Sequence, residues 1–257
     1  MAAAIRREPT SLASMSGALA ETLVRHYGID PVPLYRRAGL DPDMVGKAGA
    51  RYPYSALRAM WEEAMRATGD PCLGLVVGQN LRPGSSQVLG FAWLASSTLE
   101  DALERWVRYH RIASTAIVME RRDEADNAVY TLTSAAGVGR QSVFLGEAGL
   151  SALVALCRRA STDDFSPVWV RLGRPDPGHR SRYEAWFRAP FAIDSGVNEM
   201  AQRHIDIRRR LPAGNEDQAQ EAERWLARMH VRLDQGHTTT RVRELLSQLL
   251  SSGHATA

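Results

Sequence analysis

Apolar positions recur at the spacing of an α-helix through the first third of the chain. A stripe that follows Ser55 and stops before Gly69 places five apolar side chains on one helical face: Leu57, Met60, Trp61, Ala64 and Met65. A shorter stripe runs from Ser16 to Gly28, and its members are Leu19, Leu23, Val24 and Tyr27. Three short helices each open on an Asp-Pro pair, since Asp caps a helix and Pro fits its first turn: Asp30-Pro31, Asp41-Pro42 and Asp70-Pro71. The pattern predicts a helical N-terminal third.

The periodicity changes after a helix that begins near Ser97. The residues from Ser97 to Glu100 match a capping box, and the helix that follows places these residues on one face: Leu99, Ala102, Leu103, Trp106, Val107 and His110. Segments rich in β-formers, 115–120 and 128–133, then flank a charged turn. Alternating strands around such a turn predict an antiparallel hairpin.

Helices and strands alternate over the next part of the chain. Gln141 to Ala160 predicts a long helix, Val168 to Leu172 a strand, and a second capping box from Ser181 to Glu184 a short helix. Phe191 to Asp194 and Glu199 to His204 flank a turn and predict a second hairpin. Short strands joined mostly by hairpins favour an α+β fold, in which helices flank a small antiparallel or mixed sheet.

Two helical segments close the chain. The segment from Asn215 to Gln235 carries a narrow apolar seam at heptad spacing: Ala219, Ala222, Leu226, Met229 and Leu233. Such a seam fits one partner helix, and two alternatives stay open: a dimer helix, or packing within the same chain. The segment from Thr238 to Ala257 carries an apolar stripe that further helices would have to cover: Val242, Leu245, Leu246, Leu249 and Leu250. We therefore expect the chain to stop just inside a further domain.

These segments predict four regions. Residues 1–14 lack periodicity and are expected to be disordered. Residues 15–212 are expected to form the α+β domain, 213–236 a connector or dimerisation helix, and 237–257 the start of a truncated domain.

Composition excludes several classes of protein. The 257 residues are 44% hydrophobic, which is enough for a substantial core. No run approaches the roughly 20 apolar residues that a membrane helix needs, and the first residues lack an export signal. We therefore expect a cytoplasmic protein without a membrane partner. Cys72 and Cys157 stand in apolar contexts and are expected to be buried thiols.

The basic residues gather in two clusters although the net charge is only +3. The first comprises Arg171, Arg174, His179, Arg180 and Arg182. The second comprises Arg203, His204, Arg208, Arg209 and Arg210. Either could meet a phosphate backbone or an acidic ligand. Because neither is interleaved with aromatic residues in the manner of a single-strand platform, a solvated face is the favoured interpretation.

Known catalytic and ligand-binding motifs are absent from the sequence. There is no nucleophile elbow, Walker loop, dinucleotide fingerprint, HExxH or paired-cysteine spacing. We therefore predict no catalytic residue, no metal site and no cofactor, and a protein that is not an enzyme. Aromatic residues with two polar neighbours could instead line a small-molecule cavity: Trp93, Trp106, Tyr109, His110, Arg111, Trp169, Tyr183, Phe187 and Phe191. Core packing is the alternative for each aromatic residue.

Three segments together resemble one known family. DPCLGLVVGQNLRPGSSQVLGFAWLASSTLEDALERWVRYHRI, from Asp70 to Ile112, resembles the effector-binding region of AraC/XylS-type transcription regulators, in the subgroup with an arabinose-binding-type N-terminal domain. Val168 to Pro212 is similar in its order of strand, Pro-containing loop, aromatic helix, strand, Asn turn and strand. RVRELLSQLLSSGHATA resembles the first helix of the family's DNA-binding domain. The similarity covers Ser16 to Ala257.

The resemblance implies a homodimeric, ligand-responsive regulator in the cytoplasm, whose helix-turn-helix motifs bind a promoter. The recognition helices would lie beyond Ala257, so DNA binding is expected only through a missing C-terminal domain. Residues 15–212 would then bind a small-molecule effector of unknown identity, and 213–236 would couple it to the DNA readers. Two alternatives stay open: a ligand-independent protein-protein interaction module, and an enzyme with an unrecognised set of residues.

Overall fold

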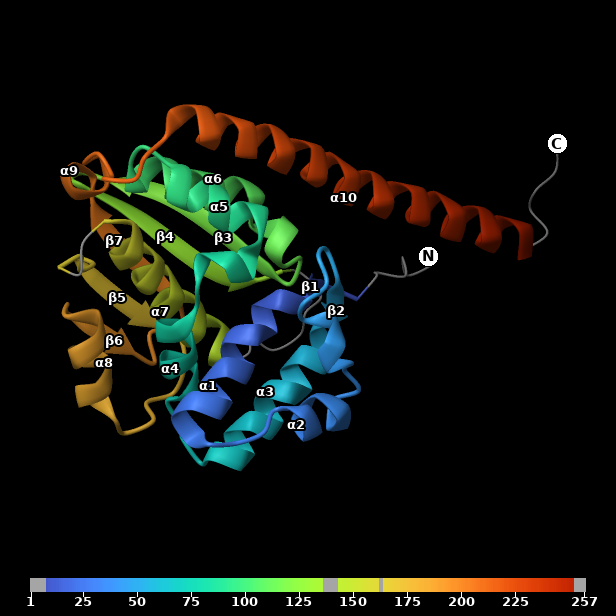
Figure 1. The fold of residues 1–257 in the computed structure, drawn as a ribbon, viewed down its shortest axis with the longest axis horizontal. Helices are drawn as coiled ribbons and strands as arrows, with labels where there is room; N and C mark the ends of the chain where they lie inside the picture. The colour runs from blue at the N-terminus through green and yellow to red at the C-terminus, as the bar shows by residue number, and fades with distance from the viewer. Residues whose placement is uncertain (1–7, 136–142, 162–163, 252–257) are drawn as a thin grey trace.

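Residues 8–135, 143–161 and 164–251 are described by the computed structural model, without the side chains of 143–145 and 234–251. A helical layer lies beside a mixed sheet, and one long helix runs along the molecule (Figure 1). The helical layer comprises β1 (Thr10–Leu12), α1 (Gly17–Tyr27), α2 (Val32–Arg37), β2 (Arg51–Pro53), α3 (Tyr54–Thr68) and α4 (Leu73–Asn80). The elements that follow are α5 (Val88–Ala95), α6 (Leu99–Ala113), β3 (Ile117–Glu124), β4 (Asn127–Ser134), α7 (Val143–Ala160), β5 (Trp169–Leu172), α8 (Arg180–Phe187), β6 (Phe191–Ile193), β7 (Glu199–Arg203), α9 (His204–Ile207) and α10 (Glu216–Ser251).

The helix boundaries of the N-terminal third follow the local signals in the sequence. Gly28 and Gly69 end α1 and α3 in the left-handed conformation, with φ of 67° and 61°. The Asp41 carboxylate accepts a hydrogen bond from the backbone N–H of Asp43 at 3.0 Å, and the Asp70 carboxylate accepts one from that of Cys72 at 2.8 Å. The predicted helical N-terminal third is therefore confirmed.

A short strand lies where disorder was expected. Thr10–Leu12 pairs antiparallel with Arg51–Pro53, and Ser11 lies opposite Tyr52. The expectation of disorder is wrong for this stretch, because the pairing partner lies some forty residues away and leaves no local periodicity. Residues 1–7, which the same expectation covers, lie outside the described residues.

Five strands form one mixed sheet within the described residues, in the order β3-β4-β7-β5-β6. The hairpin of β3 and β4 is confirmed, and its strands extend into the charged segment that was predicted as the turn. The second predicted hairpin is wrong. β7 pairs with β4 and β5, whereas β6 runs parallel to β5 on its other side. After β6 the chain crosses the end of β5, where the backbone N–H of Ser195 donates to the Leu172 carbonyl at 3.1 Å.

Both capping boxes differ from their predicted positions. The box of α6 lies one residue later, where Thr98 Oγ1 accepts from the backbone N–H of Asp101 at 3.0 Å and the Asp101 carboxylate accepts from that of Thr98 at 3.1 Å. At α8 the capping residue is His179, without a side-chain cap, so the box predicted at Ser181 is wrong. Ser181 instead lies inside the first turn of that helix.

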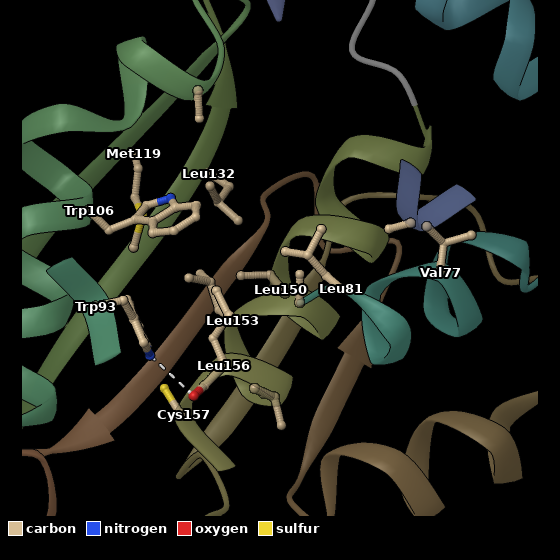
Figure 2. Packing of buried hydrophobic residues seen from close by; sticks show 14 of the residues in the cluster. Val77, Leu81, Trp93, Trp106, Met119, Leu132, Leu150, Leu153, Leu156 and Cys157 are labelled. Atoms are coloured by element: carbon tan, nitrogen blue, oxygen red, sulfur yellow. Dashed lines mark hydrogen bonds between the residues drawn. The ribbon is translucent and has the colours of Figure 1, made fainter. Parts of the chain in front are cut away.

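The sheet is covered on one face and carries a row of charges on the other. Met119, Leu132, Trp106 and Leu153 pack together between the sheet, α6 and α7 (Figure 2). Both cysteines are buried, as expected. On the opposite face three charged residues lie on three strands: Arg122 of β3, Glu199 of β7 and Arg171 of β5. The Glu199 carboxylate accepts a hydrogen bond from Arg122 at 2.6 Å and one from Arg171 at 3.4 Å. One solvated face is common in sheets that are largely antiparallel.

Helix α10 runs without a break from Glu216 to Ser251. Separate helices were expected for 213–236 and 237–257; residues 216–251 of these ranges form one helix, which passes through Gly236, and 252–257 lie outside the described residues. Its first part lies along α5 and α6, and its later part extends past them (Figure 1). The stripe from Val242 to Leu250 has side chains outside the described residues.

The heptad seam of α10 packs within the chain. Ala219, Ala222 and Leu226 are buried, and Met229 and Leu233 are half-buried. Arg105 and Arg108 of α6 hold the helix in place through Glu223, at 3.0 and 2.5 Å. The alternative of packing within the same chain therefore accounts for the three buried residues, which are not accessible to a second copy.

Candidate ligand-binding site

The aromatic residues predicted to line a cavity fall into two separate groups. In the first, Trp93 of α5 donates from Nε1 to the Leu156 carbonyl of α7 at 3.2 Å, and its ring meets Trp106 edge-on at 5.8 Å (Figure 2). Tyr109 lies edge-on to the ring of His230 of α10 at 5.9 Å. These contacts join α5, α6, α7 and α10 into one core.

The second group lies around α8. Tyr183 stacks on Phe191 with ring centroids 5.7 Å apart, and Phe187 beside it is fully buried. Trp169 stands apart from both groups: on the charged face of the sheet, its ring lies under the Arg171 guanidinium, whose carbon is 4.5 Å from the ring centroid.

The two polar residues of the prediction lie on α6. His110 Nδ1 is 2.8 Å from the Val107 carbonyl, and burial lowers the pKa of the imidazole. Arg111 is half-buried. The structure does not bring the nine predicted residues into one cavity.

An apolar cavity of about 160 Å³ lies instead between α1, α3, α4 and α7. Its wall includes apolar residues from the segment before α1, from α3, from α4 and its end, and from α7: Met15, Trp61, Val77, Leu81, Ala148 and Ala152. None of the nine predicted residues lines it. The cavity lies where the helical layer meets α7, the helix that also supports the sheet.

Close packing of α4 against α7 shapes this cavity. A Cβ placed on Gly78 would meet the Ala148 carbonyl oxygen at 2.6 Å and Ser151 Cβ at 2.5 Å. The helices approach this closely because Gly78 has no side chain, and small residues on α7 leave room beside the contact. The sequence signal that was missed is therefore a run of small residues on two helices, and it becomes visible only once the helices are known to be neighbours.

The polar groups around the cavity are mostly satisfied within the chain. The hydroxyls of Ser11 and Ser114 lie 2.6 Å apart, and the Ser16 hydroxyl lies 2.8 Å from that of Tyr35. Arg58 is exposed at the rim and lies 3.7 Å from Glu62. Within the described residues the wall includes no carboxylate. The cavity therefore favours an apolar body, with one place at its edge for a negative charge.

A buried ion pair lies next to the wall of the cavity, because Glu147 precedes Ala148 on α7. Glu147 of α7 is fully buried and accepts a hydrogen bond from Arg174 Nη1 at 2.6 Å and another from the Tyr183 hydroxyl. Burial raises the pKa of Glu147 although the Arg174 charge opposes the shift. The interpretation of the first basic cluster as a solvated face is wrong for Arg174, because this guanidinium is buried.

A second ion pair ties α8 to the helical layer. Arg182 donates two hydrogen bonds to the Asp70 carboxylate, at 2.6 and 2.8 Å, and Tyr27 of α1 donates a third at 2.5 Å. Burial opposes ionisation of Asp70, but the hydrogen bonds from Arg182 and Tyr27 outweigh it and hold the pKa well below its usual range. Bidentate Arg–carboxylate pairs of this kind are geometrically specific.

The described residues lack two other kinds of feature. No cluster of three or more His, Cys, Asp or Glu side chains in that part of the chain could hold a metal ion. None of its helices is both long enough and apolar enough to cross a membrane.

Comparisons with known proteins give consistent matches. Residues 28–211 match the family model described as the arabinose-binding domain of AraC transcription regulators, N-terminal. The chain is 27% identical over 230 residues to an ornithine utilization regulator of Pseudomonas aeruginosa, which covers 87% of this chain and 66% of that protein. The crystal structure of the transcriptional regulator CdpR from Pseudomonas aeruginosa is similar in fold, with a TM-score of 0.55 at 16% identity, over 75% of this chain and 59% of that one. The chain thus spans about two thirds of the length of these proteins or less.

Proposed function

This chain belongs to the family of N-terminal arabinose-binding-type domains of AraC transcription regulators, and from that premise we propose that its α+β body senses a small-molecule effector in the apolar cavity. The observation that carries the proposal is a preformed cavity at the junction of the helical layer and the sheet layer. Small-molecule sites are usually concave, largely apolar and preformed. Such a regulator works in the cytoplasm.

The lining favours an apolar effector with one polar or anionic group. An engineered protein cavity of about 150 Å³ binds benzene, so a single ring or a short aliphatic chain fits a space of this size. A sugar would bring several hydroxyls that need partners, because unpaired buried polar groups cost roughly 1 to 3 kcal/mol each. A diamine would need carboxylates, and none belongs to the described lining. The name of the family and the name of the relative therefore do not identify this effector.

A contiguous set of contacts supports coupling from the cavity to α10. Helix α7 contributes Ala148 and Ala152 to the cavity wall. The same helix carries Leu156, whose carbonyl oxygen accepts the hydrogen bond from Trp93 of α5. Arg105 of α6 in turn holds Glu223 of α10. An effector with different affinities for two arrangements of α7 would bias the position of α10. A C-terminal helix-turn-helix attached through this helix would then read the promoter.

We also propose a homodimer, through the outward face of α10 and not through its seam. Trp225 is 53% exposed on α10. The neighbouring helix α5 adds the exposed side chains Phe91 and Leu94. Large apolar residues on adjacent helices, rimmed by charges, are typical of a contact between proteins.

Toluene is a suitable probe for the cavity because it needs no polar partner. At about 100 times its dissociation constant it should stabilise the fold by roughly 2.7 kcal/mol, measured as a rise in melting temperature. Ala148→Leu fills the cavity and should abolish the rise. Ala227→Leu adds the same atoms to the exposed side of α10 and should retain it.

Two results would count against the proposal. A wild-type protein that does not respond to toluene would favour the ligand-independent interaction module. An Ala148→Leu variant that responds like the wild type would show that the probe binds elsewhere. A chemical conversion of a bound compound would be needed to revive the enzyme alternative.

A further inference from the structure

A second, polar cleft lies where residues of α1, α4 and α7 meet. It measures about 140 Å³ and is lined by polar and charged residues: Glu21, Arg25, His26, Asn80, Arg82 and Arg159. Three of these are guanidinium groups and one is a carboxylate. The space equals several water molecules at about 30 Å³ each.

The carboxylate neutralises only part of the positive charge. Glu21 pairs with Arg25 at 3.2 Å and with Arg82 at 2.8 Å. Arg159 has no carboxylate within ion-pair distance in the described part of the chain and instead donates to the carbonyl oxygens of Leu81 and Gln79. The cleft therefore holds a local excess of two positive charges. Burial lowers the pKa of Arg159, and the Arg82 charge lowers it further, which agrees with an unbalanced group.

We propose that this cleft binds a small oxyanion, a carboxylate or a phosphate, between Arg82 and Arg159. The planar donors of arginine match the oxygen pairs of both groups. Asn80 is held in place by hydrogen bonds to Thr22 Oγ1 at 3.2 Å and to the Val76 carbonyl at 3.0 Å. The anion would lie beside the C-terminal end of α4.

The cleft and the apolar cavity share Leu81. The side chain of Leu81 lines the cavity, whereas its carbonyl oxygen accepts the hydrogen bond from Arg159. Ala152 and Ala148 of the cavity wall and Arg159 of the cleft also belong to one helix, and Ala152 lies two turns, roughly 10 Å, from Arg159. An anion bound by Arg82 and Arg159 would fix the position of the Arg159 guanidinium. The hydrogen bonds from Arg159 to the carbonyl oxygens of Leu81 and Gln79, at the end of α4, would then be held in place. The cleft would therefore control how firmly one wall of the effector cavity is held, a consequence that rests on the proposed function of the cavity.

Titration with inorganic phosphate tests the site directly. Ionic strength is held constant with sodium chloride, and the melting temperature of the full chain is measured in the wild type, in Arg82→Gln and in Arg66→Gln. Arg66 is exposed on α3, pairs with Glu63 and lies outside the cleft, so the two variants lose the same charge. Phosphate should stabilise the wild type and Arg66→Gln alike. Loss of one hydrogen bond to a charged group should weaken phosphate binding by about tenfold or more in Arg82→Gln.

Acetate, titrated in the same way, tells a carboxylate site from a phosphate site. Stabilisation by either anion that depends on Arg82 supports the proposal. No stabilisation beyond that of chloride, or an equal loss in both variants, overturns it. Failure of toluene to bind would leave these outcomes unchanged, so the two proposals fail separately.

Hydrogen exchange tests the effect on α4 without any apolar ligand. The amide of Leu81 donates to the Gly78 carbonyl at 3.2 Å and reports the last turn of α4. The anion that stabilises the protein should slow exchange at this amide in the wild type and not in Arg82→Gln. Unchanged exchange in the wild type would refute the link between the cleft and the wall of the cavity.

Discussion

Replacing Arg174 with methionine removes the partner of a fully buried carboxylate. The side chain loses four hydrogen bonds: to Glu147 at 2.6 Å, to the Pro71 carbonyl at 2.8 Å, to the Pro175 carbonyl at 3.2 Å and to the Tyr183 hydroxyl at 3.4 Å. Among the described side chains, only Tyr183 would still donate a hydrogen bond to Glu147. Breaking a buried ion pair from one side typically costs 3 to 5 kcal/mol, because the remaining charge has no compensation. At roughly 2 to 4 °C per kcal/mol for a protein of this size, we expect the melting temperature to fall by about 10 °C.

The loss should depend on pH, and the sign follows from Glu147. Its folded-state pKa is raised, so its contribution to folding is fully present below the ordinary carboxyl pKa and is lost as pH rises through the folded value. Without Arg174, whose charge lowers the pKa of Glu147, the folded value moves higher still. Protonation relieves the uncompensated charge in acid. The difference in the free energy of unfolding between wild type and variant should therefore be larger at pH 8 than at pH 5.

Urea unfolding at a series of pH values measures both effects. Arg171→Met is the matched control, since Arg171 lies three residues earlier, is exposed, stacks on Trp169 and forms a long ion pair of 3.4 Å with Glu199. It should change the free energy of unfolding by less than about 1 kcal/mol. A loss in Arg174→Met as small as that of the control, or one that stays constant between pH 5 and pH 8, would refute the reasoning.

Two further predictions concern the second ion pair and the dimer. The folded-state pKa of Asp70 is lowered, so its contribution to folding is present above the ordinary carboxyl pKa and is lost as pH falls. Asp70→Asn should lower the free energy of unfolding by roughly 1.5 to 3 kcal/mol at pH 7. In urea unfolding, the difference in this free energy between wild type and variant should narrow below about pH 4. A gap of constant size would contradict the role given to the Arg182 pair. Trp225→Glu on the outward face of α10 should shift the protein to monomer in sedimentation, whereas Val24→Glu, equally exposed on α1, should not. A wild type that sediments as a monomer would reject the dimer.

Local signals in the sequence were sufficient for most helices and for one hairpin. Gly28 and Gly69 end helices because each adopts a positive φ, and this depends on a single residue. The hairpin of β3 and β4 needs only two neighbouring segments. The relation of β6 and β7 depends on β5, which belongs to neither, so a turn between them was not enough to predict their pairing.

The candidate site could not be predicted because its residues are ordinary one by one. Val77, Leu81 and Ala152 carry no chemical signal, and they become a cavity wall only when α4 lies against α7. The aromatic residues were predicted to line a cavity because of their residue type. In the structure the indole N–H of Trp93 donates to the Leu156 carbonyl, and the Tyr183 hydroxyl donates to the Glu147 carboxylate, so both polar groups are used inside the core. Glu147 had no feature in the sequence that distinguished it from a surface glutamate.

The continuous helix α10 behaves as a lever arm with its fulcrum on α5 and α6. Its 36 residues span about 54 Å at 1.5 Å per residue, and the described contacts hold only the portion up to about Met229. The 22 residues beyond Met229 span about 33 Å, so a tilt of about 5° would displace Ser251 by roughly 3 Å, about half a helical turn. Under the proposed function, a small shift where α10 contacts α5 and α6 would thereby become a larger displacement at Ser251.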